Sequence, residues 1–185
     1  VEEKHTGNIN FGASLGQGTG IGGFIGLEEP NLFGQGKRGK LQWQFGRNIQ
    51  DLNLSYTDPN IRETRISGTL SISDSGARSV GGAPGRRRQA GGLVQFGFPL
   101  LGARYTRLFV NYGLQKISYT GGSIDLRARY SCISCTRSTL GASIVKDTRV
   151  GLPFATGGTY LNFSGEMNGG ILGGTGDYQK IDVEG

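Results

Sequence analysis

Two cysteines, Cys132 and Cys135, stand at the C-x-x-C spacing that serves zinc binding, thiol–disulfide exchange and structural disulfides. A zinc site of this kind needs a second pair of ligands, and these two residues are the whole cysteine content of the chain. A redox site of this spacing is expected beside a βαβ unit. The sequence around the two cysteines does not suggest such a unit. We therefore expect a loop disulfide, as in proteins that face an oxidising exterior.

Catalysis and nucleotide binding are not expected from the remaining candidate groups. The single histidine, His5, lies in a charged N-terminal stretch without a Ser-His-Asp set or a matched pair of carboxylates. Gly18, Gly20 and Gly23 fit G-x-G-x-x-G, but a dinucleotide site needs a helix directly afterwards, and an alternating, strand-like segment follows here. The sequence predicts neither an enzyme nor a cofactor.

Basic residues dominate the charge, since the formal net charge is +6 and the pI is about 9.5. One run, Arg86, Arg87 and Arg88, stands in a Ser-, Gly- and Arg-rich segment at 74–89 that predicts a loop. Because aromatics are not interleaved with these arginines, we do not expect nucleic acid as a partner. Two interpretations stay open for the run: contact with phosphates of an anionic lipid leaflet, or an ordinary solvated loop.

The elements that must position these groups are strands. Apolar residues alternate with polar ones in ten segments, which is the period of a β-strand. The segments are 8–15, 20–27, 41–45, 51–57, 65–72, 92–98, 108–114, 140–144, 160–166 and 178–183. A second long loop is expected at 121–138, around the cysteines.

The connections between these segments are asymmetric. Those after even-numbered strands carry four of the five prolines, each with an aromatic nearby, and those after odd-numbered strands carry the arginine run, the cysteines and the longest polar inserts. A membrane-spanning antiparallel barrel has compact turns on one side and variable loops on the other. Mean hydropathy of −0.30 suits such a barrel, because only alternate residues meet lipid.

Several turns resemble those of the BamA superfamily of outer-membrane barrels. The matching stretches are E-P-N-L-F-G-Q-G at 29–36, Y-T-D-P-N at 56–60, G-F-P at 97–99 and D-T-R-V-G-L-P-F-A-T-G-G at 147–158. In the last stretch, Pro153 precedes Phe154 and Ala155 stands where the family usually has proline. The resemblance covers nearly the whole chain, although the family's V-R-G-[FY] segment and C-terminal aromatic strand are absent.

The resemblance implies an all-β antiparallel transmembrane barrel, of which about ten of some sixteen strands are present. Residues 1–6 would end a linker from a periplasmic domain, and residues 7–185 would form the first part of the barrel. The implied function is insertion of client outer-membrane proteins, with accessory lipoproteins and membrane lipid as partners and the outer membrane as location.

In this family the first strand forms a lateral gate for client strands. That role would fall on Gly7, Asn8, Ile9, Asn10, Phe11, Gly12, Ala13, Ser14 and Leu15. A two-partner-secretion or TamA-like translocation barrel is an alternative on the same fold. A soluble β-rich structural or adhesive protein is an alternative of another class, and it would bury Leu41, Trp43 and Phe45 in a protein core.

Overall fold

A computed structural model describes residues 7–16, 20–80, 83–121, 133–151, 154 and 156–185 of the chain. It contains ten strands and two short 3-10 helices. The strands are β1 (Asn8–Gly16), β2 (Gly20–Leu32), β3 (Lys37–Gly46), β4 (Ile49–Asp58), β5 (Ser67–Val80), β6 (Ala83–Pro99), β7 (Thr106–Thr120), β8 (Ser134–Asp147), β9 (Tyr160–Asn168) and β10 (Tyr178–Glu184). The helices are η1 (Ile61–Glu63) and η2 (Gly170–Leu172). Within the described residues, no helix has the length and apolar character needed to cross a membrane.

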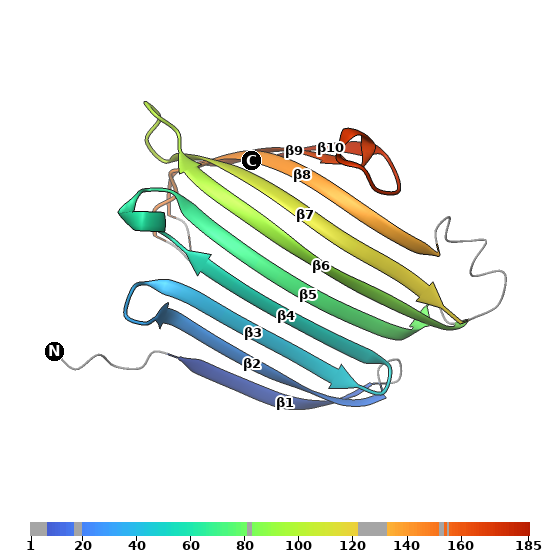
Figure 1. The fold of residues 1–185 in the computed structure, drawn as a ribbon. Helices are drawn as coiled ribbons and strands as arrows, with labels where there is room; N and C mark the ends of the chain where they lie inside the picture. The colour runs from blue at the N-terminus through green and yellow to red at the C-terminus, as the bar shows by residue number, and fades with distance from the viewer. Residues whose placement is uncertain (1–6, 17–19, 81–82, 122–132, 152–153, 155) are drawn as a thin grey trace.

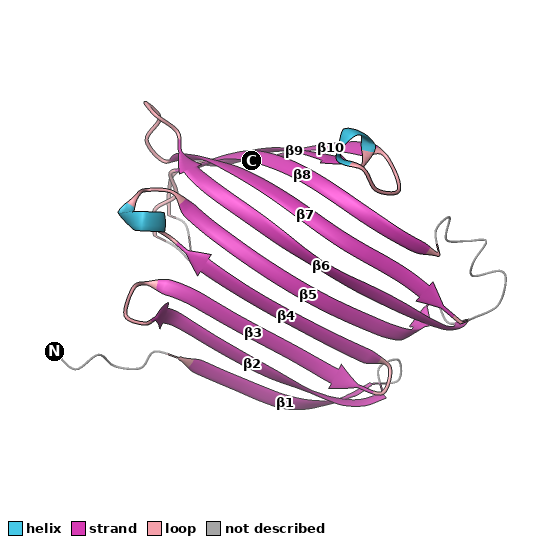
Figure 2. Ribbon diagram, in the orientation of Figure 1, coloured by secondary structure: helices cyan, strands magenta, loops and turns pink. Residues whose placement is uncertain are grey.

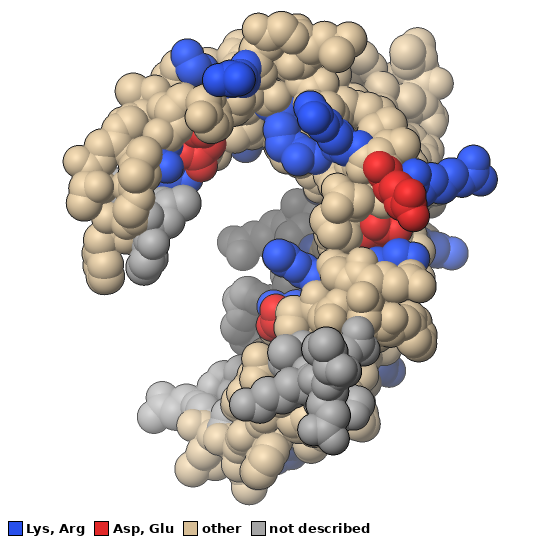
Figure 3. Space-filling view, turned by 90° about the vertical axis from the view of Figure 1, so that its left-hand side faces the viewer, with Lys and Arg blue, Asp and Glu red and all other residues tan. Residues whose placement is uncertain are grey.

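All ten strands form one antiparallel sheet in chain order, from β1 to β10 (Figure 1). Figure 2 shows that nearly all the described residues outside the strands form connections between successive strands, and that two of these connections contain the short helices. The sheet curls into an open trough, which the space-filling view shows hollowed on one side (Figure 3). The expected fold class is confirmed, and the sheet is not closed: β1 and β10 form its two borders.

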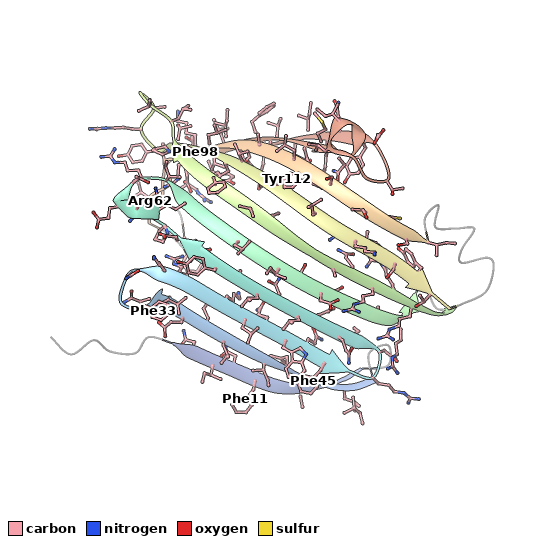
Figure 4. The ribbon with its side chains drawn as sticks, in the orientation of Figure 1. Phe11, Phe33, Phe45, Arg62, Phe98 and Tyr112 are labelled. Atoms are coloured by element: carbon pink, nitrogen blue, oxygen red, sulfur yellow. The ribbon has the colours of Figure 1, made fainter. Side chains whose placement is uncertain are left out.

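The period-two pattern sorts the side chains onto two faces. The convex outer face carries the apolar positions of successive strands, and Figure 4 labels Phe11, Phe45, Phe98 and Tyr112 among them. The concave face carries the intervening positions, which are mostly Asn, Gln, Ser, Thr and Gly. One cross-strand row on that face consists of Asn10, Gly26, Gln42, Asn53, Ser73, Gly91, Gln115 and Arg137.

A hydrophobic core is almost absent from the described part of the chain. Ile117 is its one buried hydrophobic residue, whereas Trp43 is 47% exposed and Phe45 is 38% exposed. A soluble sheet of this size would bury its apolar face against a second layer. The soluble alternative is therefore not supported, and the outer face has the composition expected of a surface in contact with lipid.

The apolar band on the outer face runs obliquely to the strands. On β1 it extends from Ile9 to Leu15, and on β9 it extends from Leu161 to Met167. The row of cross-strand partners that starts at Ile9 leaves the band on β8, where it reaches Ser138. That row contains Leu27, Leu41, Leu54, Ile72, Gly92, Leu114 and Ser138.

The band thus slips by about one residue per strand. With roughly 3.3 Å per residue and roughly 4.8 Å between strands, this slip means that the strands tilt by about 35° from the normal to the band. Spanning barrels of outer membranes have strand tilts of about 35–45°. The sheet register and the position of the apolar band together therefore support a membrane-spanning wall.

The loop predicted at 74–89 is largely strand, so that expectation was wrong, whereas the loop predicted at 121–138 is described only at residue 121 and from residue 133 onward. The 74–89 segment lies in the β5–β6 hairpin, which leaves residues 81–82 between the strands, and the 121–138 segment gives Ser134 onward to β8. Gly, Ser and Arg have weak β-propensity, but continued pairing with a neighbouring strand overrides propensity. The wall formed by β5–β8 consequently extends farther from the apolar band than the sequence predicted.

We call the end of the sheet with connections 33–36, 59–66, 100–105 and 148–159 the turn side, and the opposite end the loop side. On the turn side, Pro30 lies near the end of β2, Pro59 directly follows β4, and Pro99 ends β6. Local hydrogen bonds close the turns: the Asn31 Oδ1 accepts from the Gly36 N–H at 2.6 Å, and the Asp58 Oδ1 accepts from the Asn60 N–H at 3.0 Å. Pro153 lies outside the described residues.

Candidate functional site

The border strand β1 has one partner strand. It pairs with β2 along its whole length, from Asn8 opposite Glu28 to Gly16 opposite Gly20, and its other edge pairs with no described strand. Ile9 is 69% exposed and Phe11 is 81% exposed. Since each residue of a strand directs its N–H and C=O to one side, alternate residues of β1 present both groups at the free edge. Such an edge can pair with an extended chain.

β1 is held in strand form by its contacts with β2. Gly12 lies opposite Phe24, whose ring occupies the space where a Cβ on Gly12 would be. An aromatic side chain that covers a cross-strand glycine compensates for the glycine's missing side chain. Phe24 thus fills the space beside Gly12. Gly7 precedes the strand, and Leu15 lies within it.

The opposite border, β10, pairs only with β9 among the described strands. Its apolar residues Ile181 and Val183 are 71% and 75% exposed, and Lys180 forms an ion pair with Asp182 at 2.8 Å. Both borders of the trough therefore offer strand edges with apolar outward side chains. The sequence predicted the border role of β1 and was silent about that of β10.

The concave face carries charged and amide groups across β3–β10. Glu166 on β9 accepts hydrogen bonds from the Asn168 amide at 2.6 Å and from the Tyr178 hydroxyl at 3.4 Å. The Arg137 guanidinium lies 5.9 Å from the centre of the Tyr178 ring. A groove runs along this face, with Asn53, Gln115 and Thr139 in its lining. Its polarity suits a wetted lumen.

The predicted arginine run is split between the two faces. Arg86 and Arg88 share the parity of Val94 and Phe96 and lie exposed on the outer face, whereas Arg87 has the opposite parity and forms a side-chain hydrogen bond with Gln89. The Arg88 guanidinium makes two hydrogen bonds to Asp74, at 3.0 Å and 2.6 Å. Continuing the period-two pattern of 92–98 backward along the sequence would have indicated this split.

The structure describes one of the two predicted disulfide cysteines. Cys135 lies in β8 opposite Ile117, and Cys132 and His5 lie outside the described residues. The predicted disulfide stays a prediction. Among the described residues, no cluster of three or more His, Cys, Asp or Glu side chains is placed to hold a metal ion.

The turn at 147–158 is organised by one arginine. The Arg149 Nε and Nη2 donate to the two carboxylate oxygens of Asp147 at 3.0 Å and 2.8 Å, and the guanidinium lies 4.5 Å from the centre of the Tyr160 ring. The hydrogen bonds to Asp147 raise the pKa of Arg149 above its ordinary value. Thr148 and Thr159 join the two ends of the turn, because the Thr148 hydroxyl accepts from the Thr159 N–H at 2.8 Å.

Comparisons with known proteins agree with this geometry. The Omp85 superfamily domain matches residues 31–185, which begin near the end of β2. One similar solved structure is BamA from Haemophilus ducreyi lacking POTRA domains 1–3, with a TM-score of 0.68 and 20% sequence identity. That match covers 98% of this chain, β1 included, and 37% of the BamA chain. At this identity it shows the fold alone. No curated protein matches.

Proposed function

The chain belongs to the Omp85 superfamily, and from this we propose that it assembles client proteins into the outer membrane by pairing their strands with the free edge of β1. The barrel type and the outer-membrane location follow from the family and the fold. The insertion activity and the role of β1 are the proposal. Client outer-membrane proteins would be the substrates, with accessory lipoproteins and membrane lipid as further partners.

The observation that carries the proposal is the unpaired edge of β1 at the level of the apolar band. The apolar band continues onto β1 through the exposed side chains of Ile9, Phe11 and Leu15. The free edge of β1 therefore lies at a depth of the membrane where water is scarce. An unpaired N–H or C=O in hydrocarbon costs several kcal/mol. A client strand that paired with this edge would satisfy both chains at once, which makes strand addition favourable at this place.

Site-specific crosslinking of the native protein in cells tests the role of β1. Cysteine replaces Asn10 on β1 in a background with Cys132→Ser and Cys135→Ser, and a second cysteine is placed in the last strand of a client barrel. We expect a disulfide-linked product of client and Asn10→Cys protein during client synthesis. The matched control is Asn53→Cys, which lies in the same cross-strand row but on β4, a strand with partners on both sides.

The same pair of variants separates insertion from translocation. A client strand that pairs with β1 crosslinks at Asn10→Cys and leaves Asn53→Cys unreacted. A client that passes through the lumen meets the concave face of many strands, so both variants crosslink to the client cysteine. The second pattern would contradict strand pairing at β1 and favour a secretion-type or TamA-like barrel.

A further inference from the structure

Basic side chains gather on the outer face of the wall formed by β5–β8, just beyond the apolar band on the loop side. Gly92 on β6 and Leu114 on β7 are the last band positions of their strands. The outward positions that follow include Arg88 and Arg86 on β6 and Lys116 on β7, all exposed. We call these three residues the cationic strip.

The strip is close enough to act as one site. Arg86 and Arg88 are two residues apart on the same face, about 7 Å along the strand, and adjacent strands lie about 4.8 Å apart. Arg88 is opposite Ser118, two residues from Lys116 on β7. Arg88 therefore lies between Arg86 and Lys116, and the long side chains of each neighbouring pair can reach a common group the size of a phosphate.

Negative charge is scarce around the strip. Among the described outward residues of β5–β8 beyond the band, Asp74 is the one carboxylate. It pairs with Arg88, whose side chain is still 62% exposed. Arg78, exposed near the end of β5, adds a further cation where the β5–β6 register shifts between Ala77 and Ser79. The strip therefore keeps an excess of positive charge.

The position of the strip identifies what it meets. A wall residue just outside the apolar band lies at the level of lipid headgroups, where Lys and Arg side chains reach the polar boundary. The β5–β6 and β7–β8 hairpins extend farthest beyond the band on this side, and in outer-membrane barrels the longer extensions face the cell exterior. We propose that Arg86, Arg88 and Lys116 bind the phosphate groups of outer-leaflet lipid headgroups.

The chemistry fits phosphate better than a neutral headgroup. Arginine offers a planar fork of N–H donors that matches two phosphate oxygens, and lysine adds a point charge. Arg88 already uses its fork on a carboxylate, with Nε and Nη2 on the two oxygens of Asp74. Arg87 is excluded from this site because it faces the trough, and it supplies a control of the same residue type at the neighbouring position.

The test is binding of lipid A, which carries two phosphates, to the native protein purified in a zwitterionic detergent. The triple variant Arg86→Gln/Arg88→Gln/Lys116→Gln is compared with Arg87→Gln. Each outward cation removed should weaken binding by about five-fold, and the triple variant by about a hundred-fold. Arg87→Gln should bind like the unaltered protein. Equal weakening in both variants, or none in the triple variant, overturns the proposal.

Two further arms establish that lipid phosphate is the bound group. Dephosphorylated lipid A should bind the unaltered protein about as weakly as lipid A binds the triple variant, and equally tight binding would rule out a phosphate contact. Inorganic phosphate alone should bind far more weakly than lipid A, and equal affinity would contradict a lipid site. If the triple variant does not fold, as judged by loss of the faster-migrating band of unheated barrel on gels, Arg86→Gln/Lys116→Gln replaces it and leaves the Asp74–Arg88 pair intact.

Discussion

The border strand β1 and the wall of β5–β8 expose different parts of the chain to the membrane. Among the described strands, β1 has 9 residues and one partner, whereas β5–β8 have 14, 17, 15 and 14 residues and partners on both sides. At the border, backbone N–H and C=O groups remain to be satisfied. At the level of the apolar band, the wall strands are paired on both sides, and side chains alone meet lipid. The border therefore suits another polypeptide, and the wall suits lipid.

One free-energy cost, that of an unpaired peptide group in hydrocarbon, distinguishes the two regions. An unpaired peptide group in hydrocarbon costs several kcal/mol, so a ladder position in the wall cannot lose its hydrogen bond without a large penalty. At β1, whose outer edge pairs with no described strand, the same penalty would apply until a partner strand arrives. Substitutions that remove backbone hydrogen bonds should separate the two regions most sharply.

The largest effect is expected from proline in the wall. Val94→Pro in β6 removes one ladder N–H and leaves the carbonyl opposite it unpaired at the level of the band. We expect the yield of folded barrel to fall more than ten-fold, because the lost bond costs several kcal/mol in lipid. The measurement is the fraction of heat-modifiable protein in isolated outer membranes.

The matched substitutions on β1 are Ile9→Pro and Asn10→Pro. Adjacent residues of a strand direct their N–H groups to opposite sides, so one of these variants loses a bond to β2 and the other changes only the free edge. We expect the variant that changes only the free edge to fold normally and to assemble clients poorly. Two folded variants with normal client assembly would contradict the role assigned to β1.

A smaller effect is expected from charge in the band. Leu54 lies on the outer face of β4 between the outward residues Leu52 and Tyr56, and Asn53 faces the trough. Leu54→Arg should destabilise the barrel by about 2–4 kcal/mol, as arginine does near the bilayer midplane. Asn53→Arg should change the stability little, since its side chain meets the wetted face. Denaturant unfolding in lipid vesicles measures both variants.

Equal destabilisation by Leu54→Arg and Asn53→Arg would mean that the two faces are wrongly assigned. The assignment of faces is also what makes the wall a lipid surface, so this pair tests the premise of the cationic strip as well. A loss confined to Asn53→Arg would reverse the assignment outright.

Alternation in the sequence was enough to predict the ten strands, because each segment shows the period of two that a half-buried strand requires. Trp43 and Phe45 fell on one face and Gln42 and Gln44 on the other, as the register has them. The prolines also marked the ends of β4 and β6, whereas Pro30 lies inside β2, where the register with β3 is irregular between Glu29 and Leu32. These features are local, so the sequence carries them directly.

The sequence pattern did not predict how far the β5–β8 wall extends beyond the apolar band, nor how the band shifts from strand to strand. The three arginines at 86–88 have loop-like neighbours in the sequence. They are strand because of their pairing with Gly76 and Ala77 on β5 and with Ser118, Tyr119 and Thr120 on β7. The slip depends on which residues of neighbouring strands are opposite each other, and no single segment contains that information. Both features arise from non-local pairing.

The smallest effect is expected from removing the one carboxylate beside the strip. Asp74→Asn deletes the ion pair with Arg88, whose two atoms Asp74 Oδ2 and Arg88 Nη2 lie 2.6 Å apart. Because exposed ion pairs contribute little to folding, denaturant unfolding should be nearly unchanged. Lipid A binding should instead tighten, by about five-fold at most, since one opposing charge is gone and the Arg88 fork is released. Weaker binding would mean that Asp74 holds Arg88 in its binding orientation. The carboxylate would then have a positioning role in the wall, and β1 has no corresponding residue.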